Sequence, residues 1–177
     1  DRDFMNNYTI KIASLNDFEN CAKIIRQGFS SIARKFDLTT ANCPSNDAFI
    51  TTDELIKNKD MGNLMYALYD NHKMVGFMEL EKKNEFNYEL GKFTVLYEAR
   101  HLGYGKALLN FAKNKVKELG GEKLIISVIE NNDILKDWYR ANGFIHTDTK
   151  KVKHLPFSVD LMAVSYTHLR AHETLSD

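Results

Sequence analysis

The sequence is poor in cysteine and has no long apolar run, and each shortage excludes a class of protein. The two cysteines, Cys21 and Cys43, form no Cys-x-x-Cys pair, which argues against a disulfide framework and favours inert thiols in a reducing cytoplasm. No signal peptide is visible, and no apolar run reaches the roughly 18 residues of a membrane span, so we expect a cytoplasmic protein without membrane association. Lys plus Arg and Asp plus Glu both number 24, and this balance argues against nucleic-acid binding through overall charge.

Metal-ligand spacing is also missing, because the six histidines are scattered, so we expect no metal site. His168 and His172 lie four residues apart, but they belong to segment 165–177, which resembles translated sequencing-adapter read-through. The remaining length suits one domain with a sizeable core. We therefore expect an N-terminal extension over 1–7, a domain over 8–164 and a non-native tail over 165–177.

What the chain does contain is a strand, a sharp loop and a helix in direct succession. Residues 93–96 are apolar and β-branched, Arg100-x-x-Gly103-x-Gly105 follows, and apolar positions then recur at helical spacing. Such a loop points several backbone N–H groups at one place, and the helix dipole adds partial positive charge there. With Arg100 and Lys106 beside it, the loop is a candidate anion cradle, best suited to phosphate.

Two glycines before a helix often form only a tight turn, and this alternative stays open at this point. A dinucleotide-binding fingerprint would need a third glycine where Leu108 stands. A P-loop would need Ser or Thr where Ala107 stands. The pattern therefore disfavours both of these phosphate-binding motifs.

Hydrophobic periodicity and turn residues predict an α/β chain with one parallel crossover after an antiparallel first part. Gly28 is expected to end or bend the first helix, and Gly91 to mark a bulge or a close backbone approach. The expected strands are 8–13, 64–69, 74–82, 86–95, 124–129, 144–148 and 156–164. The expected helices are 15–27, 52–58, 103–119 and 134–141.

At this point the residues resemble the GCN5-related N-acetyltransferase (GNAT) family. The family's Arg/Gln-x-x-Gly-x-Gly/Ala loop is matched by Arg100, Gly103 and Gly105, and its Asn, Tyr and Gly-Phe pattern by Asn132, Tyr139 and 143–144. The resemblance covers about residues 8–162. It implies a single-domain fold with a mixed, mostly antiparallel sheet of six to seven strands, about four helices and splayed central strands at the acetyl-CoA site.

The resemblance also implies roles for particular residues. Tyr139 would be the general acid that protonates the leaving thiolate, and Glu89 the general base, with Glu79 or water as alternatives. Asn132 would hold the cofactor or cap its helix. An amide near Val95 or Leu96 would polarise the thioester carbonyl. The cofactor-binding set is expected to comprise Val95, Leu96, Arg100, His101, Leu102, Gly103, Tyr104, Gly105, Lys106 and Asn132.

The leading hypothesis is an acetyl-CoA-dependent N-acetyltransferase acting by direct attack of a primary amine of a small molecule or peptide, without a metal. A non-catalytic acyl-CoA-binding module and a generic nucleotide-binding domain are the alternatives, and the presence of Tyr139 favours the enzyme. The acceptor would be framed by residues 28–51, the strand bearing Glu79, and residues 154–158. Family members often pair, so the resemblance allows a homodimer, and we expect no nucleic-acid or membrane partner.

Overall fold

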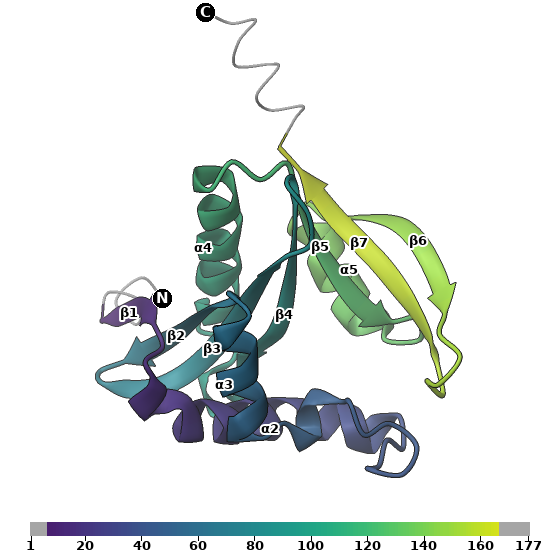
Figure 1. Cartoon of the computed structure of the whole chain (residues 1–177), viewed down its shortest axis with the longest axis horizontal. Helices are drawn as coiled ribbons and strands as arrows, with labels where there is room; N and C mark the ends of the chain where they lie inside the picture. Colours follow the sequence, from purple (N-terminus) through teal and green to yellow (C-terminus); the bar gives the residue numbers. More distant parts are fainter. Residues whose placement is uncertain (1–6, 167–177) are drawn as a thin grey trace, which may run out of the picture. The chain divides into compact units, whose positions relative to one another are not determined.

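A computed structural model describes residues 7–166 of the chain, and Figure 1 shows their arrangement. The strands are β1 (Tyr8–Ile12), β2 (Leu64–Asp70), β3 (Lys73–Lys82), β4 (Asn87–Val95), β5 (Lys123–Ile129), β6 (Ile145–Lys151) and β7 (Ser158–Ser165). The α-helices of this range are α2 (Phe18–Lys35), α3 (Thr52–Asp60), α4 (Tyr104–Glu118) and α5 (Asp133–Ala141). Three short 3-10 helices accompany them: η1 (Leu15–Asp17), η2 (Asp47–Phe49) and η3 (Tyr97–Ala99).

The strands form one seven-stranded mixed sheet of order β1-β2-β3-β4-β5-β7-β6, which confirms the predicted α/β fold class. The chain divides into two compact units. The first unit comprises Asp1–Glu81 and Gly91–Asn110, and the second comprises Lys82–Leu90 and Phe111–Asp177.

The first unit contains antiparallel strands, as predicted for the first part of the chain. Tyr8 of β1 pairs with Asp70 of β2, and Leu64 of β2 pairs with Leu80 of β3. The connection between β2 and β3 turns at Asn71 and His72, whose φ angles of 50° and 71° are left-handed. Asn tolerates this region better than most residues. The turn therefore forms in the gap expected between strands 64–69 and 74–82.

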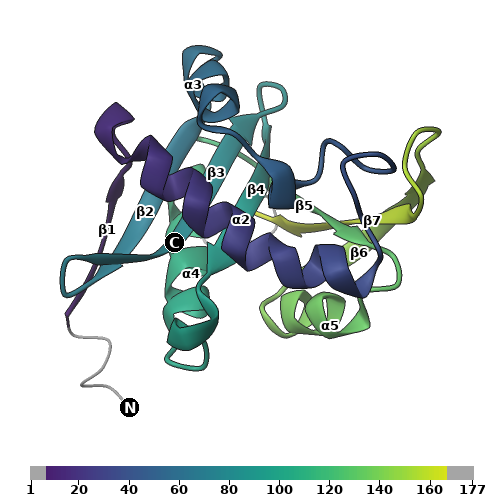
Figure 2. The same ribbon diagram turned by 90° about the horizontal axis from the view of Figure 1, so that it is seen from below.

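Helix α2 crosses the strands of this unit, as Figure 2 shows. Of the two alternatives at Gly28, a helix end is wrong, because α2 continues through Gly28 to Lys35, and a bend stays a prediction. A glycine inside a helix costs about 1 kcal/mol relative to alanine, but the apolar stripe on both sides of Gly28 packs against the sheet. Tertiary packing therefore overrides the local helix-breaking tendency of Gly28.

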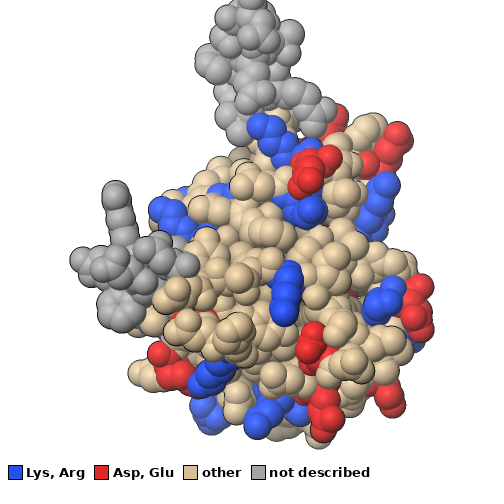
Figure 3. All heavy atoms as spheres, turned by 90° about the vertical axis from the view of Figure 1, so that its left-hand side faces the viewer, with Lys and Arg blue, Asp and Glu red and all other residues tan. Residues whose placement is uncertain are grey.

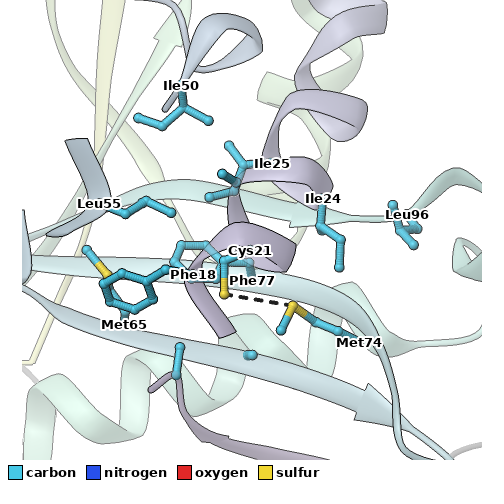
Figure 4. Packing of buried hydrophobic residues seen from close by; sticks show 13 residues of the cluster. Phe18, Cys21, Ile24, Ile25, Ile50, Leu55, Met65, Met74, Phe77 and Leu96 are labelled. Carbon is cyan, nitrogen blue, oxygen red and sulfur yellow. Dashed lines mark hydrogen bonds between the residues drawn. The ribbon is translucent and has the colours of Figure 1, made fainter. Parts of the chain in front are cut away.

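The core of the first unit lies beneath α2 (Figure 4). Phe18 and Phe77 are completely buried, and each such side chain contributes about 1.5–3 kcal/mol to folding. Cys21 donates a weak hydrogen bond to the Met74 sulfur over 3.8 Å. Burial raises the pKa of the Cys21 thiol to about 12, and Cys43 is buried as well, so both thiols lie where unreactive cysteines are expected.

The second unit contains the predicted parallel pairing. Asn87–Glu89 of β4 pair in parallel with Lys123–Ile125 of β5, and β5 pairs along its whole length with β7. The exposed strand β6 pairs with β7 on the other side. Gly120, with a φ of 81°, ends α4 as expected, since only glycine adopts this conformation without strain.

Strand β7 extends to Ser165, one residue beyond the expected end of the domain at 164. Tyr166 is 5% exposed, its amide donates to the Glu122 carbonyl, and its hydroxyl donates to the Lys113 carbonyl over 2.8 Å. The structure thus places residues 165 and 166 with the second unit. The rest of the expected tail, with His168 and His172, and residues 1–6 of the expected extension lie outside the described residues.

Candidate active site

The loop between β4 and α4 has the geometry that its two glycines predict. Gly103 has a φ of 88°, and His101 has a φ of 65°. The Arg100 Nε donates a hydrogen bond of 3.1 Å to the Val95 carbonyl, which ties the loop back to the end of β4. Arg100, His101 and Lys106 are exposed, so their basic side chains border the loop toward solvent.

The start of α4 presents backbone donors to this loop. The Ala107 amide donates to the Gly103 carbonyl over 3.0 Å and so begins the helical hydrogen-bond series. The amides that precede Ala107 have no acceptor within the helix, and the helix dipole adds partial positive charge at the same end. Such a helix end with two adjacent basic side chains can hold a phosphate or diphosphate.

The structure distinguishes between the two backbone amides expected to polarise a thioester carbonyl, those of Val95 and Leu96. The Leu96 amide donates to the Val75 carbonyl over 2.8 Å, so this N–H already has an acceptor. Val95 is 9% exposed and its carbonyl accepts from Arg100. Of the two positions, Val95 therefore remains the candidate for the oxyanion contact.

Only the backbone of Tyr104 is available to the loop, because the residue is 1% exposed. Its ring lies edge-on to that of Tyr8, with 6.1 Å between the ring centroids. Burial, followed by the hydrogen bond with Asp70, raises the pKa of Tyr104 to about 12. The phenol is therefore neutral at physiological pH and belongs to the packing of the first unit.

In the second unit, α5 carries the other family motif. The Asn132 Oδ1 accepts from the Leu135 amide over 3.4 Å, so Asn132 caps α5, one of its two expected roles. The Tyr139 ring lies edge-on to Trp138 and Phe144, with centroid distances of 5.1 and 5.3 Å. Burial raises the pKa of Tyr139, so its hydroxyl keeps its proton at neutral pH.

The two candidate bases lie in different units and in different environments. Glu89, in the second unit, accepts from the Ser127 hydroxyl over 3.1 Å and lies 3.4 Å from the Lys83 ammonium. Glu79, in the first unit, has a side chain only 4% exposed. Asn63 donates to one of its carboxylate oxygens over 2.9 Å, and Lys92 lies 2.9 Å from the other. Of the two, Glu89 is more accessible to solvent.

Sequence reasoning did not identify the ionic network around Lys92. Its ammonium lies 3.6 Å from Asp47 and 2.9 Å from Glu79. Burial alone lowers the pKa of Lys92, but the two carboxylates outweigh burial and raise it. Burial raises the pKa of Asp47 in turn. The network joins η2 to strands β3 and β4.

The residue next to Lys92 that the sequence did single out is Gly91, where a bulge or a close backbone approach was expected. The close approach is not found. A β-carbon at Gly91 would meet no described heavy atom within 4 Å. The left-handed residue is the neighbouring Lys92, with a φ of 50°. Such strain in a non-glycine residue often marks a functional position.

Residues 7–166 contain no group of three or more His, Cys, Asp or Glu side chains able to hold a metal ion. None of the helices in the same range combines the length and apolarity needed to cross a membrane.

The loop before α4 and helix α5 both lie in the part of the chain that matches a known protein family. The model of the acetyltransferase (GNAT) family matches residues 31–144. No curated protein sequence matches the chain significantly.

Many solved structures share the fold. The Escherichia coli ribosomal-protein-S18-alanine N-acetyltransferase superposes with a TM-score of 0.71 at 18% identity, over 89% of this chain and 93% of that one. The PaiA N-acetyltransferase of Thermoplasma acidophilum, in complex with coenzyme A, gives 0.70 at 19% identity, over 90% and 99%. YncA of Salmonella typhimurium, an acetyltransferase described with its cofactor acetyl-CoA, gives 0.65 at 17% identity, over 90% and 94%.

Proposed function

The chain belongs to the acetyltransferase (GNAT) family, and from this premise we propose that it transfers the acetyl group of acetyl-CoA to a primary amine of a small molecule or peptide. The observation that carries the proposal is the loop from Arg100 to Lys106, which opens α4 with Gly103 in the left-handed region. Family structures determined with coenzyme A or acetyl-CoA support this choice of co-substrate.

The loop residues would bind the coenzyme A diphosphate. The amides of Gly103, Tyr104, Gly105 and Lys106 would donate to its oxygens, as helix N-termini do for other phosphates. Arg100 and Lys106 would add positive charge, with His101 and Leu102 completing the rim. The Val95 amide would donate to the thioester carbonyl as negative charge develops on it.

Tyr139 would act as the general acid. In the reaction the amine nitrogen forms a bond to the acetyl carbon, the carbon–sulfur bond breaks, and coenzyme A departs as a thiolate. The Tyr139 hydroxyl would supply the proton that this thiolate takes. A phenol carries its proton at neutral pH and can therefore donate it, and burial of Tyr139, which raises its pKa, keeps it in this protonated form.

The proton that the amine loses needs an acceptor, and Glu89 is our first choice. Both carboxylates have partners in the described chain, but the Glu89 side chain is 28% exposed and that of Glu79 only 4%. Water is the remaining alternative. Besides capping α5, Asn132 would contact the cofactor.

The acceptor would be a small molecule or peptide, and we propose no nucleic-acid or membrane partner. On the face drawn in Figure 3, the described Lys and Arg side chains are interspersed with Asp and Glu, as expected for a protein without net charge. We further propose a cytoplasmic location on the ground of two buried free thiols. A homodimer is compatible with this function.

The test is a thiol-release assay with acetyl-CoA against amines, polyamines, amino acids and peptides, combined with thermal unfolding. We expect release with at least one acceptor and stronger stabilisation by acetyl-CoA than by ADP. Stabilisation by acetyl-CoA without turnover of any amine would favour a non-catalytic acyl-CoA-binding module. Equal stabilisation by both compounds would favour a generic nucleotide-binding domain.

A further inference from the structure

Tyr104 is the first residue of α4, and its side chain is among the largest that are fully buried in the described chain. Its backbone belongs to the first turn of the helix, between Gly103 and Lys106, where we place the coenzyme A diphosphate. Its phenol lies in the interior of the first unit, because the residue is only 1% exposed. One residue therefore connects the candidate cradle to the packed interior of this unit.

Two residues that pair across neighbouring strands contact this phenol. Tyr8 of β1 and Asp70 of β2 are partners in the antiparallel ladder at the edge of the sheet (Figure 1). The Tyr104 ring lies edge-on to the Tyr8 ring, with 62° between their planes. The Tyr104 hydroxyl donates a hydrogen bond to the Asp70 side chain. A buried phenol needs such a partner, and an ionised acceptor gives a stronger hydrogen bond than a neutral one.

The loop before α4 is consequently held on both sides of Gly103. Before this glycine, the Arg100 Nε donates to the Val95 carbonyl over 3.1 Å. After it, the hydroxyl of Tyr104 is bonded to Asp70. Gly103 itself has a φ of 88°, and glycine passes easily between left-handed and other conformations. The loop therefore depends on these two flanking contacts to keep a single conformation.

We propose that Tyr104 is a positioning residue for the cofactor: its bond to Asp70 holds the first turn of α4 so that the amides of residues 103–106 converge on the coenzyme A diphosphate. Phenylalanine fills nearly the same space but cannot fix the direction of the turn. Only molecules with converging amides bind the diphosphate, so the apparent Kd rises in inverse proportion to their fraction. The inference rests on the proposed acetyltransferase function, since the diphosphate belongs to its co-substrate.

The experiment removes this one hydroxyl and measures both cofactor binding and opening of the helix start. By calorimetry, Tyr104→Phe should raise the Kd for acetyl-CoA about 10-fold, as expected when a hydrogen bond to a charged group is lost. In the protein without ligand, hydrogen exchange is followed at the Ala107 amide, which donates to the Gly103 carbonyl. Its exchange should accelerate in Tyr104→Phe, because the first turn opens more often.

Two controls distinguish local opening from a general loss of stability. Tyr166→Phe is the matched variant, since it also removes a hydrogen-bonded hydroxyl from a buried phenol, in the second unit. It should leave the Kd for acetyl-CoA and the exchange of Ala107 unchanged. Within Tyr104→Phe, the Leu55 amide at the start of α3 should exchange as in the original protein, because it donates to Thr51 and belongs to another helix of the same unit.

Variants of Asp70 test the other end of the hydrogen bond and keep the inference testable if Tyr104→Phe does not fold. Asp70→Ala leaves the phenol without its acceptor and should raise the Kd for acetyl-CoA as Tyr104→Phe does. Asp70→Asn keeps a side-chain oxygen that can accept the bond, so it should bind acetyl-CoA more tightly than Asp70→Ala. Combining Tyr104→Phe with Asp70→Ala should add little to either change, because both remove the same interaction.

The outcomes separate this inference from the proposed function. An unchanged Kd in Tyr104→Phe, or an equal rise in Tyr166→Phe, would overturn the positioning role and leave the acetyltransferase intact. Fully additive effects of Tyr104→Phe and Asp70→Ala would overturn it as well. Failure of the original protein to bind acetyl-CoA would instead contradict the proposed function, and the cofactor role of Tyr104 with it.

Discussion

Gly28 of α2 lies so close to Thr94 of β4 that a β-carbon on Gly28 would fall 1.7 Å from the Thr94 hydroxyl oxygen. The same β-carbon would lie 2.9 Å from the Thr94 β-carbon. Thr94 is 4% exposed, so its side chain has little room to move away. Glycine is therefore required here by the distance between helix and strand, although its backbone conformation is an ordinary helical one.

We expect Gly28→Ala to lower the free energy of unfolding by about 1–3 kcal/mol through overpacking. This loss should appear although alanine is the better helix former by about 1 kcal/mol. Urea unfolding measures it, with Gly91→Ala in the adjoining strand as the control, since a β-carbon there meets nothing within 4 Å. Thr94→Ala should rescue Gly28→Ala only in part, because the contact between β-carbons remains. Equal stability of the two glycine variants would contradict the packing argument.

Gly103→Ala should weaken acetyl-CoA binding about 10-fold, because a left-handed φ costs an L-residue about 1–2 kcal/mol and distorts the cradle. Gly62→Ala is the matched control: Gly62 has a similar φ of 99°, with open space around it, at the end of α3. Both variants should lose comparable stability in urea. Calorimetric titration with acetyl-CoA should distinguish them, and an equal loss of affinity in both would count against the cradle.

Tyr139→Phe should lower kcat about 100-fold or more while the Kd for acetyl-CoA stays near the original value, since a general acid contributes about 10²–10⁴-fold. The matched control is Tyr166→Phe, which removes another buried phenol of raised pKa whose hydroxyl donates to the Lys113 carbonyl. This control should lose stability and keep its kcat. Steady-state thiol release and thermal unfolding measure the two effects. An unchanged kcat in Tyr139→Phe would remove Tyr139 from the mechanism.

The two candidate bases should respond differently to amide substitution. Glu89→Gln should lower kcat/KM with little loss of stability, because the proton acceptor is lost. Glu79→Gln should mainly lower stability, because it leaves the Lys92 ammonium with one carboxylate fewer. Measuring kcat/KM and urea unfolding of both variants decides the assignment. A lower kcat/KM in Glu79→Gln with no change in Glu89→Gln would transfer the role to Glu79.

Acid should destabilise the second unit through Asp160. Burial raises its pKa, but the hydrogen bonds from Lys136 and Thr149 outweigh burial, so the folded-state pKa lies below the usual value. A depressed carboxyl pKa contributes stability that is fully present above the unfolded pKa of about 3.9 and is lost as the pH falls through the folded pKa.

Asp160→Asn should therefore be less stable than the original protein at pH 7 and lose less stability between pH 5 and pH 2. Urea unfolding followed by the fluorescence of Trp138, the single tryptophan, measures this. Asp137→Asn is the control, because Asp137 pairs with Arg140 on the exposed surface of α5. A pH dependence unchanged by Asp160→Asn would contradict the assignment.

The sequence by itself determined the order of the elements and the two motif-bearing segments. Apolar periodicity, the Gly120 helix stop and the polar turn at Asn71 are local signals, and local signals act through the backbone of a few neighbouring residues. For the same reason Gly103 and the start of α4 could be predicted, since a left-handed glycine before a helix depends on few distant contacts.

Only the tertiary structure decided which residues from separate elements contact or pair with one another. In the sequence, Gly28 predicts the end or a bend of a helix. The need for glycine becomes clear only in the folded chain, where α2 packs against Thr94 and leaves no room for a β-carbon. The link from Asp47 through Lys92 to Glu79 joins η2 to two consecutive strands, β4 and β3, and the spacing of these residues in the sequence does not predict it. The sequence likewise leaves the Leu96 amide available to a thioester carbonyl, whereas in the folded chain this amide donates to the Val75 carbonyl. Close approach and buried charge pairing depend on where separate elements meet, so they are properties of the folded chain.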